Sequence, residues 1–260
     1  MMKTLLQKVM DVVRKTKQIV TMPFDVEEKD GASNLVTTVD CAVQQYLKTE
    51  LSKVLPEADF LGEEDPHFVE KGMFWVVDPI DGTSNFVRGM NLSAISVALV
   101  ENGEGVLGVV YNPFTDEMFY AVKGGGAFLN GTPIKVTDKD LSHSLLFTAF
   151  SLYNKNLAEP CEKVLWELYP KCDDFRRLGS AALELCYIAA GRAELYFEMR
   201  IFPWDWAAAG VVLKEAGAFV GTLHQPLRYD KPIILIVGNT EENYQAVAST
   251  VLKHVPVLPY

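Results

Sequence analysis

The stretch from Phe74 to Phe86, FWVVDPIDGTSNF, carries the pattern that decides the fold. Its apolar beginning is typical of a buried strand, and the strand runs directly into two carboxylates, Asp78 and Asp81. Pro79 makes the turn rigid, because its ring fixes a backbone dihedral. Gly82 and the two hydroxyl residues after it suit the N-terminus of a helix. The stretch therefore predicts negative charge concentrated where a strand ends and a helix begins.

The same turn is suited to hold a metal ion. Its two carboxylates can converge on one point and expose the carbonyl of Ile80 as a third oxygen ligand, and hard oxygen donors select magnesium or a similar cation. The first turn of a helix leaves N–H groups unpaired, so the amides of Gly82, Thr83 and Ser84 could bind a phosphate. The alternative is that both carboxylates are ordinary turn and cap residues, and the pattern alone leaves this open.

Two other acidic segments strengthen the metal hypothesis. FLGEED, residues 60–65, places Glu63 and Glu64 just after a short apolar strand. Much later, Asp205 stands between two tryptophans at the start of an apolar helix. A buried carboxylate needs a partner, and a metal is the partner that this arrangement suggests. A role for Asp205 as a helix N-cap is the alternative, and it is compatible with metal binding.

Composition bounds the class of protein. The chain has 260 residues, of which 49% are hydrophobic and 22% charged, so it can bury a sizeable core without disulfides. Its net charge of −10 argues against nucleic acid as a partner, because that role usually needs a basic patch. Divalent cations held by carboxylates would let an acidic enzyme act on an anionic substrate. Four scattered cysteines form no CxxC pair, which indicates neither a zinc site nor a disulfide framework.

The opening segment predicts an amphipathic helix packed on the body of the protein. Leu5, Val9, Val12 and Val13 recur at roughly helical spacing. Five basic residues interrupt the first twenty, so the segment lacks the continuous apolar region of a signal peptide or membrane span. We therefore expect a cytoplasmic location and no membrane partner.

Helices and strands can be placed coarsely along the chain. A helix is expected from Val39 to Leu55, ended by Pro56. Apolar runs from Met73 onward predict a multi-stranded, largely antiparallel sheet. The run 124–126, GGG, follows one strand and precedes another, so it predicts a tight strand connection and not a phosphate loop.

After Ser142, strands and helices alternate. The later helices are expected at 157–169, 207–216 and 241–253, with the apolar strand IILIVG at 233–238. No low-complexity linker separates the halves, so we expect two sub-domains that share an interface. These are an N-terminal α+β sub-domain, 1–141, with most of the candidate metal ligands, and a C-terminal α/β sub-domain, 142–260, with Asp205.

Three motifs in this order resemble the signatures of the inositol monophosphatase family of metal-dependent phosphatases: GEE at Glu63, DPIDGTSNF from Asp78 and WD at Asp205. The resemblance begins at Lys29, includes LVTTVD ending at Asp40, and extends over nearly the whole chain. It implies an α/β (α+β) fold, namely a layered αβαβα sandwich of the inositol monophosphatase and sugar phosphatase type. The metal site would lie in the cleft between the two halves.

The resemblance also implies a role for each residue of the motifs. Two or three magnesium ions would be held by Glu63, Asp78, the Ile80 carbonyl, Asp81 and Asp205. A metal, together with Thr83 paired with Asp40, would activate the attacking water, and Glu63 would belong to this catalytic set. Glu64 would sit just behind the ions. Gly82 and Thr83 would hold the phosphate through backbone amides, and the rest of the substrate would face Gly179, Ser180, Ala181, Glu198 and Asp205.

The activity expected from the resemblance is hydrolysis of an inositol monophosphate or a similar small polyol phosphate by metal-activated water. A homodimer and inhibition by lithium are implied as well. Similar folds act as fructose-1,6-bisphosphatases and as 3′-phosphoadenosine 5′-phosphate phosphatases. Arg177 and Arg200 keep these alternatives open, because an arginine fork can hold a second anionic group, although each could equally be structural. A regulatory binding protein on a phosphatase fold is the alternative from another class.

Overall fold

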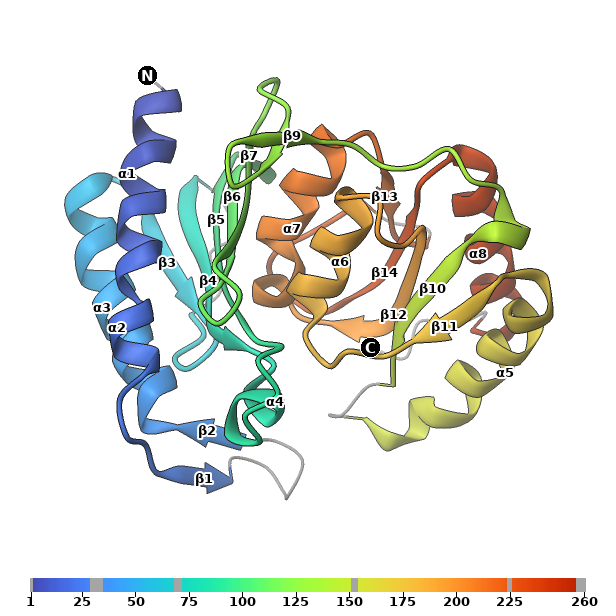
Figure 1. The fold of residues 1–260 in the computed structure, drawn as a ribbon, viewed down its shortest axis with the longest axis horizontal. Helices are drawn as coiled ribbons and strands as arrows, with labels where there is room; N and C mark the ends of the chain where they lie inside the picture. The colour runs from blue at the N-terminus through green and yellow to red at the C-terminus, as the bar shows by residue number, and fades with distance from the viewer. Residues whose placement is uncertain (1, 29–34, 68–71, 151–153, 224–225, 256–260) are drawn as a thin grey trace.

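The computed structural model describes residues 2–28, 35–67, 72–150, 154–223 and 226–255. Helices and sheets alternate in five layers along the long axis of the molecule (Figure 1). A seven-stranded and a five-stranded sheet enclose a central pair of helices, and further helices cover the outer face of each sheet. This architecture is the αβαβα sandwich that the sequence predicted.

The first outer layer contains the N-terminal helices. They are α1 (Met2–Lys15), α2 (Lys17–Val20) and α3 (Thr38–Val54), and α3 follows a two-stranded ribbon of β1 (Val26–Glu28) and β2 (Leu35–Thr37). Val9 and Val13 of α1 and Val43 and Leu47 of α3 are fully buried in the core beneath this layer. The predicted N-terminal helix is therefore confirmed, and the predicted helix over 39–55 is confirmed to within one residue at each end.

The seven-stranded sheet follows in the order β3-β4-β5-β6-β7-β8-β9, and only β3 and β4 pair in parallel. Its strands are β3 (Asp59–Gly62), β4 (Met73–Asp81), β5 (Ala94–Glu101), β6 (Glu104–Asn112), β7 (Glu117–Val122), β8 (Ala127–Leu129) and β9 (Thr132–Ile134). Side chains of β4 alternate between two cores: Trp75 belongs to the core under α1 and α3, whereas Phe74 and Val76 belong to the central core. Burial on both faces explains why this strand is a continuous apolar run.

The central layer is formed by α6 (Ala181–Ala189) and α7 (Pro203–Glu215), and α7 is buried over most of its length. α7 approaches the first sheet so closely that a Cβ added to Gly108 would lie 2.2 Å from the carbonyl oxygen of Ala208. The helix begins four residues before the predicted Ala207. The sequence-based boundary was wrong because a proline is well tolerated in the first turn of a helix, where its missing N–H has no partner to lose.

The five-stranded sheet lies beyond this layer in the order β11-β10-β12-β14-β13. Its strands are β10 (Leu145–Ala149), β11 (Asp174–Arg176), β12 (Leu195–Ile201), β13 (Phe219–Gly221) and β14 (Ile233–Gly238). The outer face of this sheet packs on α5 (Ala158–Leu168) and α8 (Glu241–His254). Three short 3-10 helices lie in this half of the described chain: η1 (Leu141–His143), η2 (Lys155–Leu157) and η3 (Tyr169–Lys171). The predicted alternation of strands and helices after residue 142 is confirmed.

The glycine run at 124–126 connects β7 to β8, as predicted. The amides of Gly124 and Gly126 each donate a hydrogen bond of 2.8 Å to the carboxylate of Glu215, at the end of α7. This connection thus binds a carboxylate of the protein itself. The two sheets come from separate parts of the chain, 59–134 and 145–238, while the division into sub-domains at residue 141 stays a prediction.

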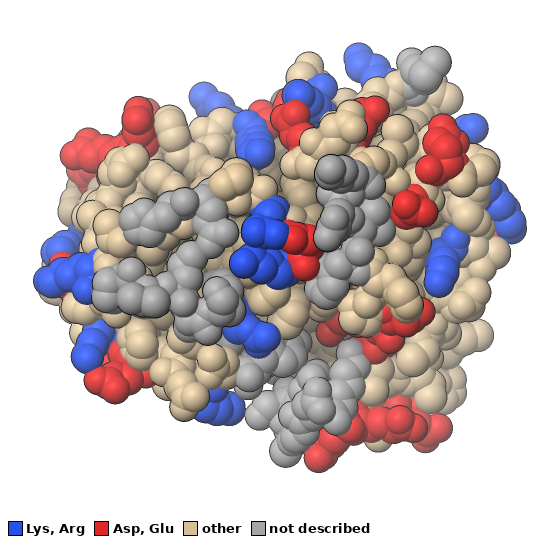
Figure 2. Space-filling model, turned by 180° about the vertical axis from the view of Figure 1, so that it is seen from behind, with Lys and Arg blue, Asp and Glu red and all other residues tan. Residues whose placement is uncertain are grey.

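Charged side chains on the rear face are interspersed with a larger neutral surface (Figure 2). Among the residues described on that face, basic side chains form no continuous band. Within the described ranges, no helix has the length and apolar content that crossing a membrane requires.

Candidate active site

The junction of β4 and α4 (Thr83–Val87) has the strand-to-helix geometry that the sequence predicted. Gly82 is the N-cap residue of α4 and adopts a left-handed conformation with φ of 87°. A side chain at this position would also meet backbone, because an added Cβ would lie 3.0 Å from the carbonyl oxygens of Gly179 and Leu92. The turn can therefore bring its two carboxylates to the inner face of the molecule only with glycine at position 82.

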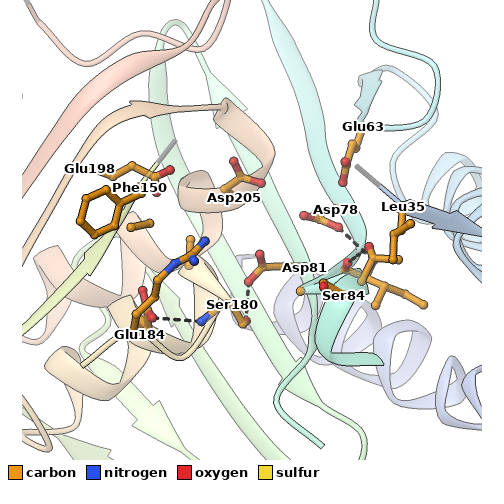
Figure 3. A pocket seen from close by; sticks show the side chains of 17 residues that line it. Leu35, Glu63, Asp78, Asp81, Ser84, Phe150, Ser180, Glu184, Glu198 and Asp205 are labelled. Atoms are coloured by element: carbon orange, nitrogen blue, oxygen red, sulfur yellow. Dashed lines mark hydrogen bonds between the residues drawn. The ribbon is translucent and has the colours of Figure 1, made fainter. Parts of the chain in front are cut away.

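Three carboxylates meet at this junction and form what we call the carboxylate cluster: Asp78, Asp81 and Asp205. Each offers an oxygen atom, and these oxygens all lie within 4.8 Å of one another. Asp78 and Asp81 end β4, whereas Asp205 lies in the first turn of α7, where its carboxylate accepts a hydrogen bond from the amide of Phe202. Asp205 is thus the third residue of the helix and not its N-cap. Figure 3 shows the three side chains pointing toward one space, with Glu63 beside them.

The electrostatics of the carboxylate cluster disfavour three simultaneous negative charges. Burial raises the pKa of Asp81 to about 6 and holds the pKa values of Asp78 and Asp205 well above their ordinary range. The charge of Glu63 raises the pKa values of both Asp78 and Asp205 further. Buried carboxylates this close together need positive charge, and an all-oxygen donor set suits a hard divalent cation. The residues present therefore fit a magnesium site.

Asp81 also joins the two halves of the site. Its carboxylate accepts a hydrogen bond from the hydroxyl of Ser180, which is the N-cap residue of α6. It accepts a second hydrogen bond, of 2.8 Å, from the amide of Ala182. A second bridge comes from Asn85, whose side-chain amide donates to the carbonyls of Leu92 at 2.8 Å and Leu178 at 2.7 Å. Asn85 was not singled out from the sequence. Leu178 lies 93 positions away along the chain, where no local pattern indicates it.

Thr83 and Asp40 are brought together although 43 positions separate them. The Thr83 hydroxyl lies 3.1 Å from a carboxylate oxygen of Asp40 and 3.0 Å from the carbonyl oxygen of Ile80. The other Asp40 oxygen accepts a hydrogen bond of 2.9 Å from the amide of Thr37, within the capping box of α3. Burial raises the pKa of Asp40. The helix cap thus fixes the carboxylate that orients the threonine.

The opposite wall carries two glutamates, of which Glu184 is buried and Glu198 is half-buried. Glu198 of β12 accepts a hydrogen bond of 2.6 Å from the Tyr196 hydroxyl, and burial raises its pKa to about 7. Glu184 of α6 accepts hydrogen bonds from the amides of Leu178 and Gly179, and burial raises its pKa to about 8. Sequence reasoning missed Glu184. A lone acidic residue in the apolar run AALELCYIA was the signal that could have identified it.

These walls line an open cleft of about 770 Å³, a volume that includes the solvent at its mouth. Seventeen residues line it: Leu35, Glu63, Asp78, Ile80, Asp81, Gly82, Thr83, Ser84, Ala149, Phe150, Arg177, Gly179, Ser180, Ala181, Glu184, Glu198 and Asp205. All the predicted site residues are among them except Asp40, which acts on the cleft through Thr83. Glu64 and Arg200 are not part of the lining, and Lys29 lies outside the described residues. Leu35, Ala149 and Phe150 were not predicted.

A model of the inositol monophosphatase family matches residues 1–255 of the chain. The chain belongs to the inositol monophosphatase family. Membership assigns it a phosphatase fold with a metal-binding site, in agreement with the donor set of the carboxylate cluster.

Individual members of the family that resemble this chain have names of two kinds. The Nus factor SuhB of Vibrio cholerae serotype O1 is 40% identical over 193 residues, which are 73% of this chain and 72% of that protein. The solved structure of the Thermotoga maritima IMPase superposes with a TM-score of 0.85 at 32% identity, covering 96% of this chain and 98% of that one. The extragenic suppressor protein SuhB of Bartonella henselae also gives 0.85, at 28% identity, covering 96% and 99%.

Proposed function

We propose that this protein hydrolyses an inositol monophosphate or a similar small polyol phosphate, with water as the nucleophile and magnesium as the cofactor. The observation that carries the proposal is the carboxylate cluster, whose three oxygens lie within 4.8 Å of one another in the wall of the cleft. Membership of the inositol monophosphatase family supports the same reaction class.

The carboxylate cluster, together with Glu63 and the carbonyl of Ile80, would hold two or three magnesium ions. When bound, magnesium supplies the positive charge that neutralises a phosphate and lowers the pKa of water. Glu63 suits this role because it lines the cleft and its charge acts on both Asp78 and Asp205. The raised pKa values of these carboxylates mean that the metal-free cluster holds protons, which metal binding would displace.

Thr83 would orient the attacking water. A hydroxyl has a single proton, so a Thr83 hydroxyl that donates to Asp40 turns its oxygen lone pairs toward the cleft, where they can accept a hydrogen bond from water. Asp40 holds the threonine in this orientation, because its other oxygen is fixed by the amide of Thr37. The backbone amides of Gly82 and Thr83 would hold the phosphate of the substrate, and Gly82 is the N-cap of α4.

The remaining lining would hold the alcohol part of the substrate. Gly179, Ser180, Ala181 and Glu198 face the cleft from across the carboxylate cluster. Glu198 can accept hydrogen bonds from the hydroxyl groups of a polyol, and Tyr196 keeps its carboxyl group in place. Polar acceptors of this kind discriminate between alcohols, because a substrate that lacks the matching hydroxyl leaves them without a partner.

A substrate panel tests the proposed function. Inositol 1-phosphate, fructose 1,6-bisphosphate, phosphoadenosine phosphate and glycerol 2-phosphate are each incubated with magnesium or with chelator, and released phosphate is measured. We expect turnover that depends on magnesium. Asp81→Asn should reduce this turnover by several orders of magnitude, because the variant loses a ligand of the catalytic metal. The matched control is Asp59→Asn, at an exposed aspartate outside the cleft. Activity that survives chelation, or near-normal turnover in Asp81→Asn, would refute the proposal.

A regulatory binding role is the second candidate, favoured by the 40% identity to a protein named Nus factor SuhB. The fold does not decide between the two roles. A sample that binds a macromolecule but releases no phosphate from any ester of the panel would put this role first.

The resemblance to the family extends the main proposal in two ways. The protein would form a homodimer, which sedimentation analysis would check. Lithium would inhibit it, which assays in lithium chloride would check.

A further inference from the structure

The cleft has one basic side chain among its described lining residues, and this is Arg177. Six carboxylates line the same space: Glu63, Asp78, Asp81, Glu184, Glu198 and Asp205. Magnesium would neutralise the charge of the carboxylate cluster. Arg177 lines the same cleft as Glu198, and its positive charge lowers the pKa of Glu198. The cleft therefore has a second, separate source of positive charge.

The backbone that carries Arg177 is fixed on both sides. Strand β11 ends at Arg176, and the turn that follows is held where Asn85 donates to the carbonyl of Leu178 and Glu184 accepts from the amides of Leu178 and Gly179. The side chain itself is exposed. A fixed backbone with an exposed guanidinium is suited to binding a ligand, because little of the chain has to be ordered when the ligand arrives.

Arg177 is not engaged in an ion pair with any residue that the structure describes. Its neighbour Arg176 differs, because it forms an ion pair with Asp174 and donates to the carbonyl of Phe175. Arg200, the other arginine considered from the sequence, is placed over the ring of Phe202, 4.9 Å from its centroid, and does not line the cleft. The structure thus separates the three arginines by what their guanidinium groups face.

We propose that Arg177 binds a second anionic group of the substrate, so that the cleft favours small phosphate esters that carry another phosphate or a carboxylate. The proposal rests on the proposed function, hydrolysis of a phosphate ester in this cleft. A guanidinium fork can make two parallel hydrogen bonds to a phosphate or carboxylate. Arg177 takes no part in bond breaking, and the second anionic group leaves the reaction unchanged.

Electrostatics explain why an arginine would be needed for such a substrate. A second anionic group that extends from the carboxylate cluster toward Glu198 meets a wall lined by two more carboxyl groups, Glu184 and Glu198. Without Arg177, the acidic lining would repel this group, and the cleft would select esters with a neutral alcohol part. With Arg177, the preference reverses for molecules whose second group reaches the guanidinium.

The experiment compares two substrates across three variants. Fructose 1,6-bisphosphate and inositol 1-phosphate are assayed with the wild type, Arg177→Ala, Arg177→Lys and the control Arg176→Ala. Hydrogen bonds to charged groups correspond to about 10- to 100-fold in affinity. We therefore expect Arg177→Ala to lower kcat/KM for the bisphosphate about 10- to 100-fold more than it lowers kcat/KM for the monophosphate. Most of this difference should come from a higher KM for the bisphosphate. Arg177→Lys should lie between, because lysine keeps the charge but lacks the fork. Arg176→Ala should leave the ratio of the two substrates as it is.

An equal loss for both substrates in Arg177→Ala would overturn the proposal, because it would show an effect on the shared phosphate alone. No loss for either would overturn it as well. If the wild type releases no phosphate from either ester, the proposed function fails separately, and calorimetric titration of both ligands in magnesium then tests the arginine. In that case a bisphosphate Kd that Arg177→Ala weakens less than a few-fold overturns the proposal, while selective weakening on the order of tenfold supports it.

Discussion

Asp81→Asn is expected to stabilise the metal-free protein while removing its response to magnesium. Burial raises the pKa of Asp81 from 3.8 to about 6, which means that the folded state holds the carboxyl proton more tightly than the unfolded state. The difference between these pKa values corresponds to about 3 kcal/mol of unfolding free energy. Asparagine is neutral at every pH, so it avoids this cost, and its side-chain oxygen can still accept from Ser180 or Ala182.

The sign of the effect depends on pH. Below about pH 4 the carboxyl group is protonated in both the folded and the unfolded state, so the charge of Asp81 costs nothing. As the pH rises from about 4 to about 6, the unfolded state releases its proton first, and the stability of the wild type falls relative to the variant. Above about pH 6 the difference is complete. The advantage of Asp81→Asn should therefore grow from near zero to at most about 3 kcal/mol over this window.

Urea unfolding, followed by tryptophan fluorescence, measures the effect in chelator at pH 4, 6 and 8. Asp59→Asn is the control, because this exposed carboxylate lies outside the cleft. Adding magnesium at 100 times its dissociation constant should stabilise the wild type by about 2.7 kcal/mol and the variant far less. Magnesium should therefore close most of the gap of about 3 kcal/mol between the two proteins. A difference that is the same at all three pH values, or equal stabilisation of both proteins by magnesium, would refute the reasoning.

Other parts of the site and the core give further predictions. Thr83→Ala should lower kcat by about 10²- to 10⁴-fold in steady-state assays, because it removes the hydroxyl that Asp40 orients. Thr83→Ser keeps a hydroxyl and should recover most of the rate. An equal loss in both variants would exclude a catalytic role for the hydroxyl. Gly108→Ala should lower the unfolding free energy by about 1–3 kcal/mol or more in urea, since the added methyl group meets the carbonyl of Ala208; unchanged stability would contradict this contact. Magnesium affinity, measured by calorimetry in buffers of different ionisation enthalpy, should rise from pH 5.5 to 8 with proton release, because the carboxylate cluster is partly protonated without metal; a pH-independent affinity would show that no proton is displaced.

Local pattern was sufficient for the elements whose signals lie within a few residues. The apolar run before Asp78 and the glycine at 82 indicated a strand followed by a helix, and the structure has β4 and α4 there, although β4 continues to Asp81. The site residues were identified because the motifs resemble those of a family. Spacing alone does not bring Asp205 to β4, since the two segments are more than 120 positions apart.

The parts that could not be predicted depend on contacts between distant segments. Asn85 has the sequence pattern of an ordinary polar helix residue, because the contact that distinguishes it is with Leu178, 93 positions away. Glu184 can lie in an apolar helix because its carboxyl group accepts hydrogen bonds from two amides of the preceding turn. The position of Phe150 in the wall follows from how β10 docks in its sheet, which no pattern in the strand itself specifies.

The close approach of α7 to the first sheet has a consequence for how the sequence can evolve. Gly108 fixes the distance between β6 and the backbone at Ala208, less than one helical turn after Asp205. A bulkier residue at 108 would push the helix outward and carry Asp205 away from its two partners on β4. Natural selection for turnover would therefore act on this glycine as strongly as on a ligand. A mutational scan scored by activity would mark position 108 as essential, even in a background stable enough to fold with the substitution.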